Sequence, residues 1–418
     1  MNGAGVTMDG GITFPQGFRS SGVACGIKRS FRPDLALVVT DTEAAAAGVF
    51  TTNRIRAAPV VLTEDRLART GGKTRGVLVV SGVANALTGP EGRKDSELLL
   101  DAAERSLGVP AGSLYHAATG VIGPRIPVDL VTKHIPEAVG FLEPGRNAAR
   151  RSASAIMTTD TVAKEAAVVL RRANGTKFRV GGMAKGSGMI APALGPPHAT
   201  TLGFLSTDCP ATPEGLQKIL SEEADRTFNM VCVDGDTSTN DTLLVFANGR
   251  AGGAPADEDP ALRAGIGQVL EQLARAVARD GEGATKMLTV KVSGAADTGG
   301  ARLAARAIAR SVLVKTALFG SDPNVGRIAC ALGYSGAGFE LDELRVDLED
   351  GNRRWPLIQE GHPVPGLDNG AGKRLHTILQ RMDEVVLRVE LGQGPAGATA
   401  WGCDLSYGYV QINAQYRT

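Results

Sequence analysis

Aromatic residues, histidines and cysteines are all scarce in this chain of 418 residues. Phe, Trp and Tyr together make up 4% of it, and there are five histidines and five cysteines. Because the cysteines are odd in number, scattered and without a Cys-x-x-Cys pair, they argue against a disulfide framework and against a zinc site. We predict free, buried thiols in a reducing compartment. The histidines show no spacing typical of metal ligands, so no metal ion is predicted.

An excess of charge of one sign and long apolar runs are also missing. The chain has 45 Lys and Arg against 44 Asp and Glu, a net charge of +1, and this balance provides no field that would attract nucleic acid or an acidic membrane. No segment reaches the roughly 18 to 20 apolar residues of a membrane span. The N-terminus lacks the basic and apolar regions of a signal peptide. We therefore predict a cytoplasmic protein without nucleic-acid or membrane partners.

Short runs rich in Val and Ile alternate irregularly with helical periodicity. Asn174-Gly175 between two such runs predicts a hairpin, and the mixed order favours a layered α+β fold over a doubly wound parallel sheet. A loop is expected at 249–259, and the prolines between 192 and 197 suggest a boundary near residue 200. The predicted strands are 35–40, 76–81, 114–117, 166–171, 177–180, 230–233, 242–247, 287–293, 384–390 and 407–413. The predicted helices are 96–107, 147–157, 212–228, 260–278, 300–318 and 371–380.

The glycine-rich segment 181–191 raises the question of a nucleotide site. Gly186, Gly188 and Ala191 match a dinucleotide fingerprint, but that fingerprint must open a helix, and the prolines from Pro192 onward prevent one. A phosphate loop needs its lysine after the last glycine, whereas Lys185 precedes Gly186. We therefore reject a nucleotide. Lys185 suits a substrate carboxylate, and the alternative is an exposed lysine on a flexible loop.

Three polar segments are further candidates, each with a structural alternative. Segment 118–123 offers the Thr119 hydroxyl and the Gly120 amide as oxyanion donors, although it also reads as an ordinary strand-to-turn sequence. Segment 157–161 either caps a helix, which is the default, or binds a polar substrate. Segment 234–242 has three aspartates but not the spacing of a calcium loop, so a hydrogen-bonded turn is expected.

The dipeptide Ala199-Thr200 follows the glycine- and proline-rich segment and precedes an apolar run. A threonine becomes a strong nucleophile when its own α-amine acts as base, and that amine is free only if the chain is cut before it. The pattern therefore predicts self-cleavage between Ala199 and Thr200. His198 lies close to the cut, but we expect no essential role for it.

The chain resembles the ornithine acetyltransferase (glutamate N-acetyltransferase) family of arginine biosynthesis over nearly its whole length. The motifs include Ala118-Thr-Gly-Val-Ile-Gly123, Ala184-Lys-Gly-Ser-Gly-Met-Ile190 and Gly320-Ser-Asp-Pro-Asn-Val-Gly-Arg327. Further matching segments are 15–28, 48–53, 155–161, 236–242 and 404–413. So many matches in the same order make chance resemblance negligible.

The resemblance implies a self-cleaved enzyme with an α chain of residues 1–199 and a β chain of residues 200–418, paired as α2β2. It implies a layered α/β/β/α fold, shared with self-processing aminopeptidases. The implied reaction is ping-pong acetyl transfer from N-acetylornithine to glutamate through an acetyl-enzyme, without a cofactor. Some family members also accept acetyl-CoA, which we keep as a further donor.

The resemblance also implies roles for individual residues. Thr200 would be the nucleophile, with its amine as base, and Thr119 and Gly120 would form the oxyanion hole. An acidic and a basic side chain on one site suit an amino-acid substrate that carries both charges. The implied substrate contacts are Thr158, Lys185, Thr200, Glu282, Asn413 and Thr418.

One departure from the family concerns the junction itself. Gly195-Pro-Pro-His198 reads as a four-residue insertion just before the cut, and Thr201 stands where the family usually has Met or Leu. A cut before Thr201 is therefore an alternative to the cut before Thr200. Two other functions stay open: an acyltransferase or amidase of the same fold acting on a different acylated amino compound, and an uncleaved binding protein.

Overall fold

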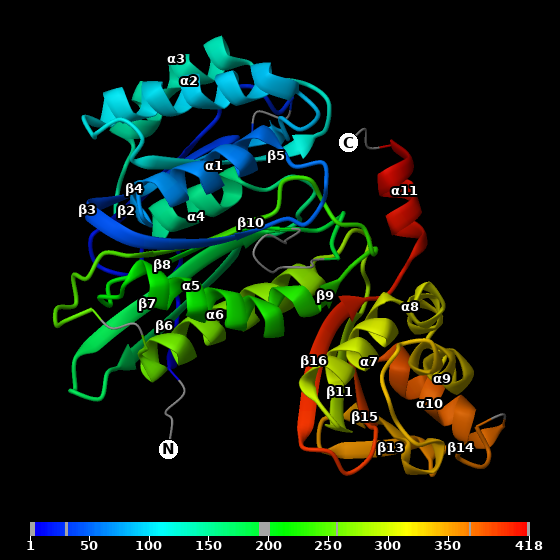
Figure 1. The fold of residues 1–418 in the computed structure, drawn as a ribbon. Coiled ribbons are helices and arrows are strands. Elements are labelled where there is room, and N and C mark those ends of the chain that lie inside the picture. The colour runs from blue at the N-terminus through cyan, green and yellow to red at the C-terminus, as the bar shows by residue number, and fades with distance from the viewer. Residues whose placement is uncertain (1–4, 30–31, 192–200, 256–257, 368, 416–418) are drawn as a thin grey trace.

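The computed structural model describes residues 5–29, 32–191, 201–255, 258–367 and 369–415, and they form two β-sheets with helices packed on both (Figure 1). The nine-stranded sheet runs β1-β6-β7-β8-β10-β3-β4-β5, with β2 paired to β3. The second sheet has the order β14-β13-β12-β15-β11-β16-β9. This mixed architecture confirms the predicted layered fold. Among the described residues, none of the helices has the length and apolarity to cross a membrane.

The elements of the first sheet and its helices come mainly from the first two thirds of the chain. The strands are β1 (Val6–Met8), β2 (Phe18–Val23), β3 (Leu35–Phe50), β4 (Lys73–Val83), β5 (Leu114–Val121), β6 (Lys164–Arg171), β7 (Lys177–Lys185), β8 (Leu202–Thr207) and β10 (Thr242–Ala247). The helices are α1 (Ala58–Arg69), α2 (Gly89–Leu107), α3 (Val128–Gly140), α4 (Arg146–Ala155), α5 (Pro213–Arg226) and α6 (Pro260–Arg279).

The second sheet and its helices occupy the remainder. Its strands are β9 (Val231–Cys232), β11 (Met287–Ala295), β12 (Arg345–Asp350), β13 (Arg353–Gln359), β14 (His362–Pro363), β15 (Glu384–Glu390) and β16 (Ala396–Cys403). The helices are α7 (Thr298–Arg310), α8 (Val312–Phe319), α9 (Val325–Gly333), α10 (Gly370–Gln380) and α11 (Tyr407–Gln415), with short 3-10 turns at Phe228–Met230 and Leu341–Glu343. Helix α7 packs on β11 and β16.

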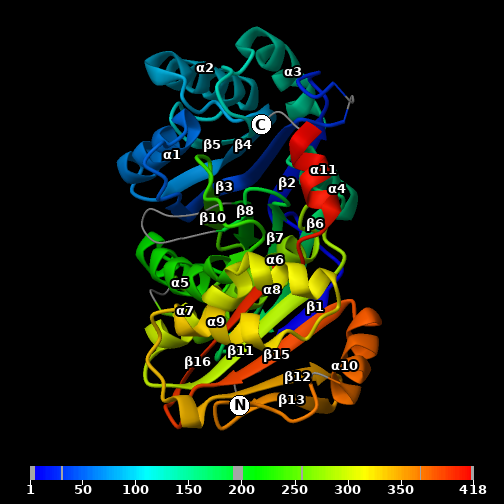
Figure 2. The ribbon, with the colours of Figure 1, turned by 90° about the vertical axis from the view of Figure 1, so that its right-hand side faces the viewer.

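The first sheet folds over on itself because β3 is long and its pairing with β4 shifts register between Val39 and Ala44. Side chains alternate between the two faces of a strand. Leu78 of β4 faces α2 and α3, whereas Val77 belongs to the same buried cluster as Phe204 of β8. The opposite face of β8 and its neighbours packs on α5 and α6. Figures 1 and 2 show that α2 and α3 cover one layer of the folded first sheet and that α5 and α6 cover the other. This part of the molecule therefore has an α/β/β/α arrangement.

Most predicted elements lie where the sequence places them, including the β6–β7 hairpin at Asn174-Gly175 and the Thr212 cap of α5. The predicted helix 300–318 is interrupted at Ser311, whose extended backbone ends α7 and whose Oγ caps α8. The predicted strand 407–413 is wrong, because α11 occupies this segment. On either side of the expected boundary near residue 200, β7 and β8 are adjacent antiparallel strands of one sheet.

Candidate active site

A cavity of about 230 Å³ gathers the predicted site residues that the structure describes. They come from β5, β7, the segment after α4, the segment after α6, and α11. Thr201, the residue before β8, also lines this cavity. The remaining predicted site residues, Ala199, Thr200 and Thr418, lie outside the described residues. The six that line the cavity are Thr119, Gly120, Thr158, Lys185, Glu282 and Asn413.

Lys185 is the last residue of β7 and is 8% exposed, so the alternative of an exposed lysine on a flexible loop is wrong. Its Nζ donates a hydrogen bond to Thr119 Oγ1 at 3.2 Å. Burial lowers the pKa of Lys185, which the negative charge of Asp160 opposes. Because the Thr119 oxygen accepts from Lys185, the hydroxyl hydrogen remains available for another acceptor in the cavity.

Gly120 lies where β5 meets β4 at an irregular pairing with Gly82. Its φ of 131° is disfavoured for residues with a side chain. A Cβ on Gly120 would lie 2.3 Å from the carbonyl carbon of Gly82, so only glycine fits. The two glycines let the backbones approach closely and end the strand beside the cavity.

Glu282 reaches the cavity from the segment after α6 and is 6% exposed. Its Oε2 accepts a hydrogen bond of 2.7 Å from Asn413 Nδ2. A Cβ on Gly188 would lie 2.3 Å from the Glu282 carboxylate, so this glycine makes room for the acid. In the helix α11, Tyr409 and Asn413 are four residues apart and therefore both face the cavity.

Lys164 forms the centre of a buried network beneath the cavity. Its side chain is fully buried, and Nζ lies 2.6 Å from Asp160 Oδ1 and 2.6 Å from Asp280 Oδ2. Asp160 also accepts from the backbone amides of Thr158 and Gly186, which adjoin or form the cavity wall. Burial would raise the pKa of Asp160, but Lys164 and Lys185 more than offset this and lower it to about 2. Segment 157–161 thus lines the cavity rather than capping α4.

Replacing Lys164 with methionine should lower the free energy of unfolding by about 3 to 5 kcal/mol, because two buried carboxylates lose their common partner. Denaturant unfolding compared with the wild type measures this loss. The exposed Lys177, on the neighbouring strand, provides the matched control, and Lys177→Met should change stability little. Adding Asp160→Asn and Asp280→Asn to Lys164→Met should recover part of the loss. Equal stability of Lys164→Met and Lys177→Met would contradict the network's importance.

Asp234 closes another wall of the cavity. Its carboxylate accepts backbone hydrogen bonds from Met189 at 2.6 Å and Ile190 at 2.8 Å, and one from Asp236. Burial raises the pKa of Asp234, and those amides oppose the shift. These contacts confirm the predicted hydrogen-bonded turn. Within the described ranges, no three His, Cys, Asp or Glu side chains are grouped so that they could hold a metal ion.

Sequence reasoning missed Lys164, Asp280 and Asn240 as parts of this site. Lys164 follows Asp160 by four residues, but the segment between them is not helical, so spacing alone carried no signal. Asp280 lies 120 residues from Asp160 along the chain. Only the packing of α6 beside β6 and β7 brings these side chains together.

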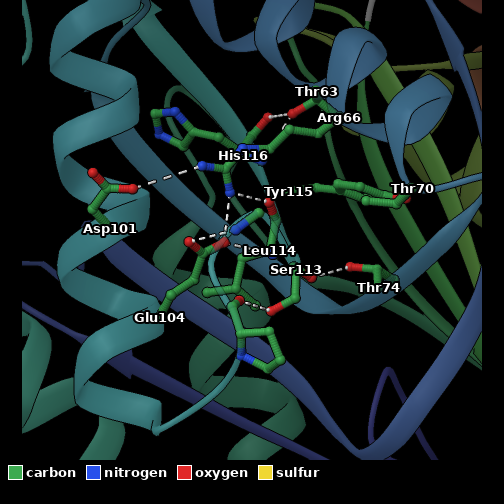
Figure 3. Close-up of polar contacts among 12 residues, drawn as sticks. Thr63, Arg66, Thr70, Thr74, Asp101, Glu104, Ser113, Leu114, Tyr115 and His116 are labelled. Carbon is green, nitrogen blue, oxygen red and sulfur yellow. Dashed lines mark hydrogen bonds and ion pairs between the residues drawn. The ribbon is translucent and has the colours of Figure 1, made fainter.

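His116 lies on β5, three residues before Thr119, in a buried polar region under α1 and α2 (Figure 3). Its backbone exchanges hydrogen bonds with the Thr63 hydroxyl, but both ring nitrogens are buried without a partner. Nearby, Arg66 pairs with Glu104 and donates to the Leu114 carbonyl. Burial, reinforced by the charge of Arg66, lowers the pKa of His116 from 6.5 to about 3.

His116→Leu should make the protein less sensitive to acid. Between about pH 6.5 and 3 the unfolded chain binds a proton at this histidine that the folded chain does not, so wild-type stability falls as the pH falls. From pH 8 to pH 5 the loss at this site amounts to about 2 kcal/mol, at about 1.4 kcal/mol per pH unit below 6.5. Urea unfolding at both pH values measures it. The exposed His362 is the control, and an unchanged pH dependence in His116→Leu would contradict the assignment.

Relatives of this chain occur among known proteins. The model of the ArgJ family matches residues 19–418. The chain belongs to the ArgJ family. It is 46% identical to the arginine biosynthesis bifunctional protein ArgJ of Symbiobacterium thermophilum, over 98% of this chain and 99% of that protein. The ArgJ protein of a Synechococcus strain is 43% identical over the full length of both.

A solved ArgJ-family structure also matches part of the chain. Ornithine acetyltransferase from Mycobacterium tuberculosis, in complex with ornithine, is 40% identical over 45% of this chain and 100% of its own, with a TM-score of 0.41. The family model and the full-length relatives confirm, at the level of the ArgJ family, the resemblance drawn from the sequence motifs.

Proposed function

We propose that this chain transfers an acetyl group from N-acetylornithine to glutamate through an acetyl-enzyme on Thr200. The main support for the proposal is that Thr119, Gly120, Lys185 and Glu282 line one and the same cavity. Thr201 lies in the wall of this cavity. Membership of the ArgJ family supports it, since relatives are named for arginine biosynthesis. A cytoplasmic location, α2β2 assembly and use of acetyl-CoA as a further donor belong to the same proposal.

The substrate's charges match the cavity. N-acetylornithine carries a carboxylate and an ammonium group, and the cavity offers a buried lysine and two buried carboxylates, those of Asp241 and Glu282. In our assignment Lys185 binds the carboxylate and Glu282 binds the ammonium group, with Asn413 orienting Glu282. Charge-assisted hydrogen bonds of this kind are strong in a site shielded from water.

The reaction proceeds in two halves on the same hydroxyl. Free α-amines titrate near pH 8, close to the working pH. The Thr200 α-amine takes the hydroxyl proton as Oγ attacks the acetyl carbonyl. The Thr119 hydroxyl and the Gly120 amide stabilise the negative oxygen of the tetrahedral intermediate. The C–N bond breaks, ornithine leaves with the proton, and an acetyl ester remains on Thr200. The amine of glutamate then attacks this ester, which returns the hydroxyl and yields N-acetylglutamate.

Intact mass spectrometry followed by an acetyl-transfer assay tests the proposal. We expect two chains, the second beginning at Thr200, and N-acetylglutamate formed at the same rate as ornithine. Ornithine released without N-acetylglutamate would favour an amidase. A single uncut chain without transfer would favour a binding protein and contradict the proposal.

A further inference from the structure

Asn240 is a buried residue of the cavity wall whose polar atoms are all engaged. It is 4% exposed. Its side-chain nitrogen donates to the carbonyls of Ala118, at 2.8 Å, and Ala84, at 2.5 Å. Its side-chain oxygen accepts from the Thr239 hydroxyl at 2.7 Å. Two carbonyl acceptors on one side and a hydroxyl donor on the other determine which way the amide points.

The two carbonyls belong to the ends of adjacent strands. Ala118 is bonded directly to Thr119, and Ala84 follows the last residue of β4. Between them lies the irregular Gly82–Gly120 pairing, where the register of the two strands shifts. The Asn240 amide therefore ties the ends of these two strands together at the point where Thr119 and Gly120 reach the cavity.

On its other side, Asn240 adjoins the strand pair that follows Thr200. The backbone amide of Thr242 donates to the Thr201 carbonyl at 2.9 Å, and Thr242 is paired with Leu202 of β8. Strands β3 and β4 separate β10 from β5 in the sheet order. Asn240 bridges this separation directly, because the sheet folds over on itself.

The loop that carries Asn240 has other anchors. The Thr51 hydroxyl donates to the Ser238 carbonyl, Asn53 Nδ2 donates to the Thr237 carbonyl at 2.8 Å, and the Ala57 amide donates to the Thr239 carbonyl. These contacts hold the loop against the end of β3 without involving the Asn240 side chain. The side chain of Asn240 is therefore not needed to keep its own loop in place.

We propose that Asn240 is a positioning residue for acetyl transfer: its amide holds the carbonyl that precedes Thr119 and so sets the oxyanion donors relative to the strand that follows Thr200. This inference rests on the acetyl transfer proposed above. Within the described residues, the side-chain hydrogen bonds of Asn240 are those with Ala84, Ala118 and Thr239. Asn240 acts through Thr119 and Gly120, so its effect falls on the tetrahedral intermediates and not on the binding of ornithine.

The test compares Asn240→Ala and Asn240→Asp with Asn53→Ala. Both Asn240 variants lose the two donated hydrogen bonds, and the aspartate keeps the size of the side chain. Asn53→Ala loses one anchor of the same loop without touching β5. Rates of enzyme acetylation by N-acetylornithine and of deacetylation by glutamate are measured separately, per mole of cut chain. Ornithine affinity is measured by calorimetry, and the thermal midpoint reports folding.

We expect both half-reactions of the Asn240 variants to slow by a common factor of about 10 to 100, since one pair of donors serves both. KM and ornithine affinity should stay within about twofold of the wild type, and Asn53→Ala should retain wild-type rates. Unchanged rates in the Asn240 variants, an equal loss in Asn53→Ala, or ornithine binding weakened in parallel would overturn the inference. So would Asn240 variants that stay uncut while Asn53→Ala is cut. A wild type without acetyl transfer contradicts the proposed function instead.

Discussion

Thr200→Ala should leave one uncut chain of 43.3 kDa and lower acetyl transfer by at least about 10³-fold. Alanine has neither the hydroxyl that attacks the preceding carbonyl nor the hydroxyl that carries the acetyl group, so cleavage and turnover are lost together. Loss of a catalytic nucleophile typically removes several orders of magnitude in kcat. Intact mass spectrometry and a glutamate-dependent transfer assay on the same sample measure both effects.

Thr201→Ala is the matched control, because the sequence also allows a cut before Thr201. If Thr200 is the nucleophile, Thr201→Ala should still be cut, its second chain should begin at Thr200, and it should transfer acetyl. Thr201 lines the cavity, so a modest change in KM is compatible with this assignment. A Thr200→Ala protein that still formed two chains and transferred acetyl, alongside an inactive Thr201→Ala, would move the nucleophile by one residue.

Gly120→Ala should lower kcat by about 10² to 10³-fold while the enzyme stays folded. The added Cβ would lie 2.3 Å from the Gly82 carbonyl carbon, at a φ of 131° that alanine rarely adopts. The end of β5 must therefore shift, and the Gly120 amide no longer points where the oxyanion forms. Steady-state kinetics measure the loss, and circular dichroism checks the fold.

Gly123→Ala is a control that distinguishes the steric clash of an added Cβ from the strain of a positive φ. Gly123 also has a positive φ, of 108°, but a Cβ there meets nothing within 4 Å. We expect Gly123→Ala to retain most of its kcat. Thr119→Val, which removes the hydroxyl at nearly constant volume, gives a second measurement if Gly120→Ala does not fold. Full activity in both Gly120→Ala and Thr119→Val would rule out this pair as the oxyanion donors.

Much of the fold could be predicted because its signals are local. The Asn174-Gly175 turn sets a hairpin, and Thr212-Pro213 starts a helix whatever lies around them. The errors arise where local patterns are ambiguous. The aromatic and β-branched residues in 407–413 suit a strand, but no strand among the described residues pairs with this segment, and the helix satisfies its own backbone. In 300–318 the helical periodicity continues across Ser311, and only the backbone at that residue separates α7 from α8.

The sequence by itself determined which family this chain belongs to and which six described residues share the cavity. This was possible because motifs in a fixed order, with a common chemistry, can be recognised without the structure. Tertiary structure decided the rest. Lys185 is buried only because β7 ends beneath the cavity, and Lys164 meets Asp280 only because α6 packs beside β6. Asn240 reaches Ala118 only because the long strand β3 lets one sheet fold into two layers. Charges, hydrogen bonds and burial act over a few ångströms in space, and distances along the chain do not reveal them.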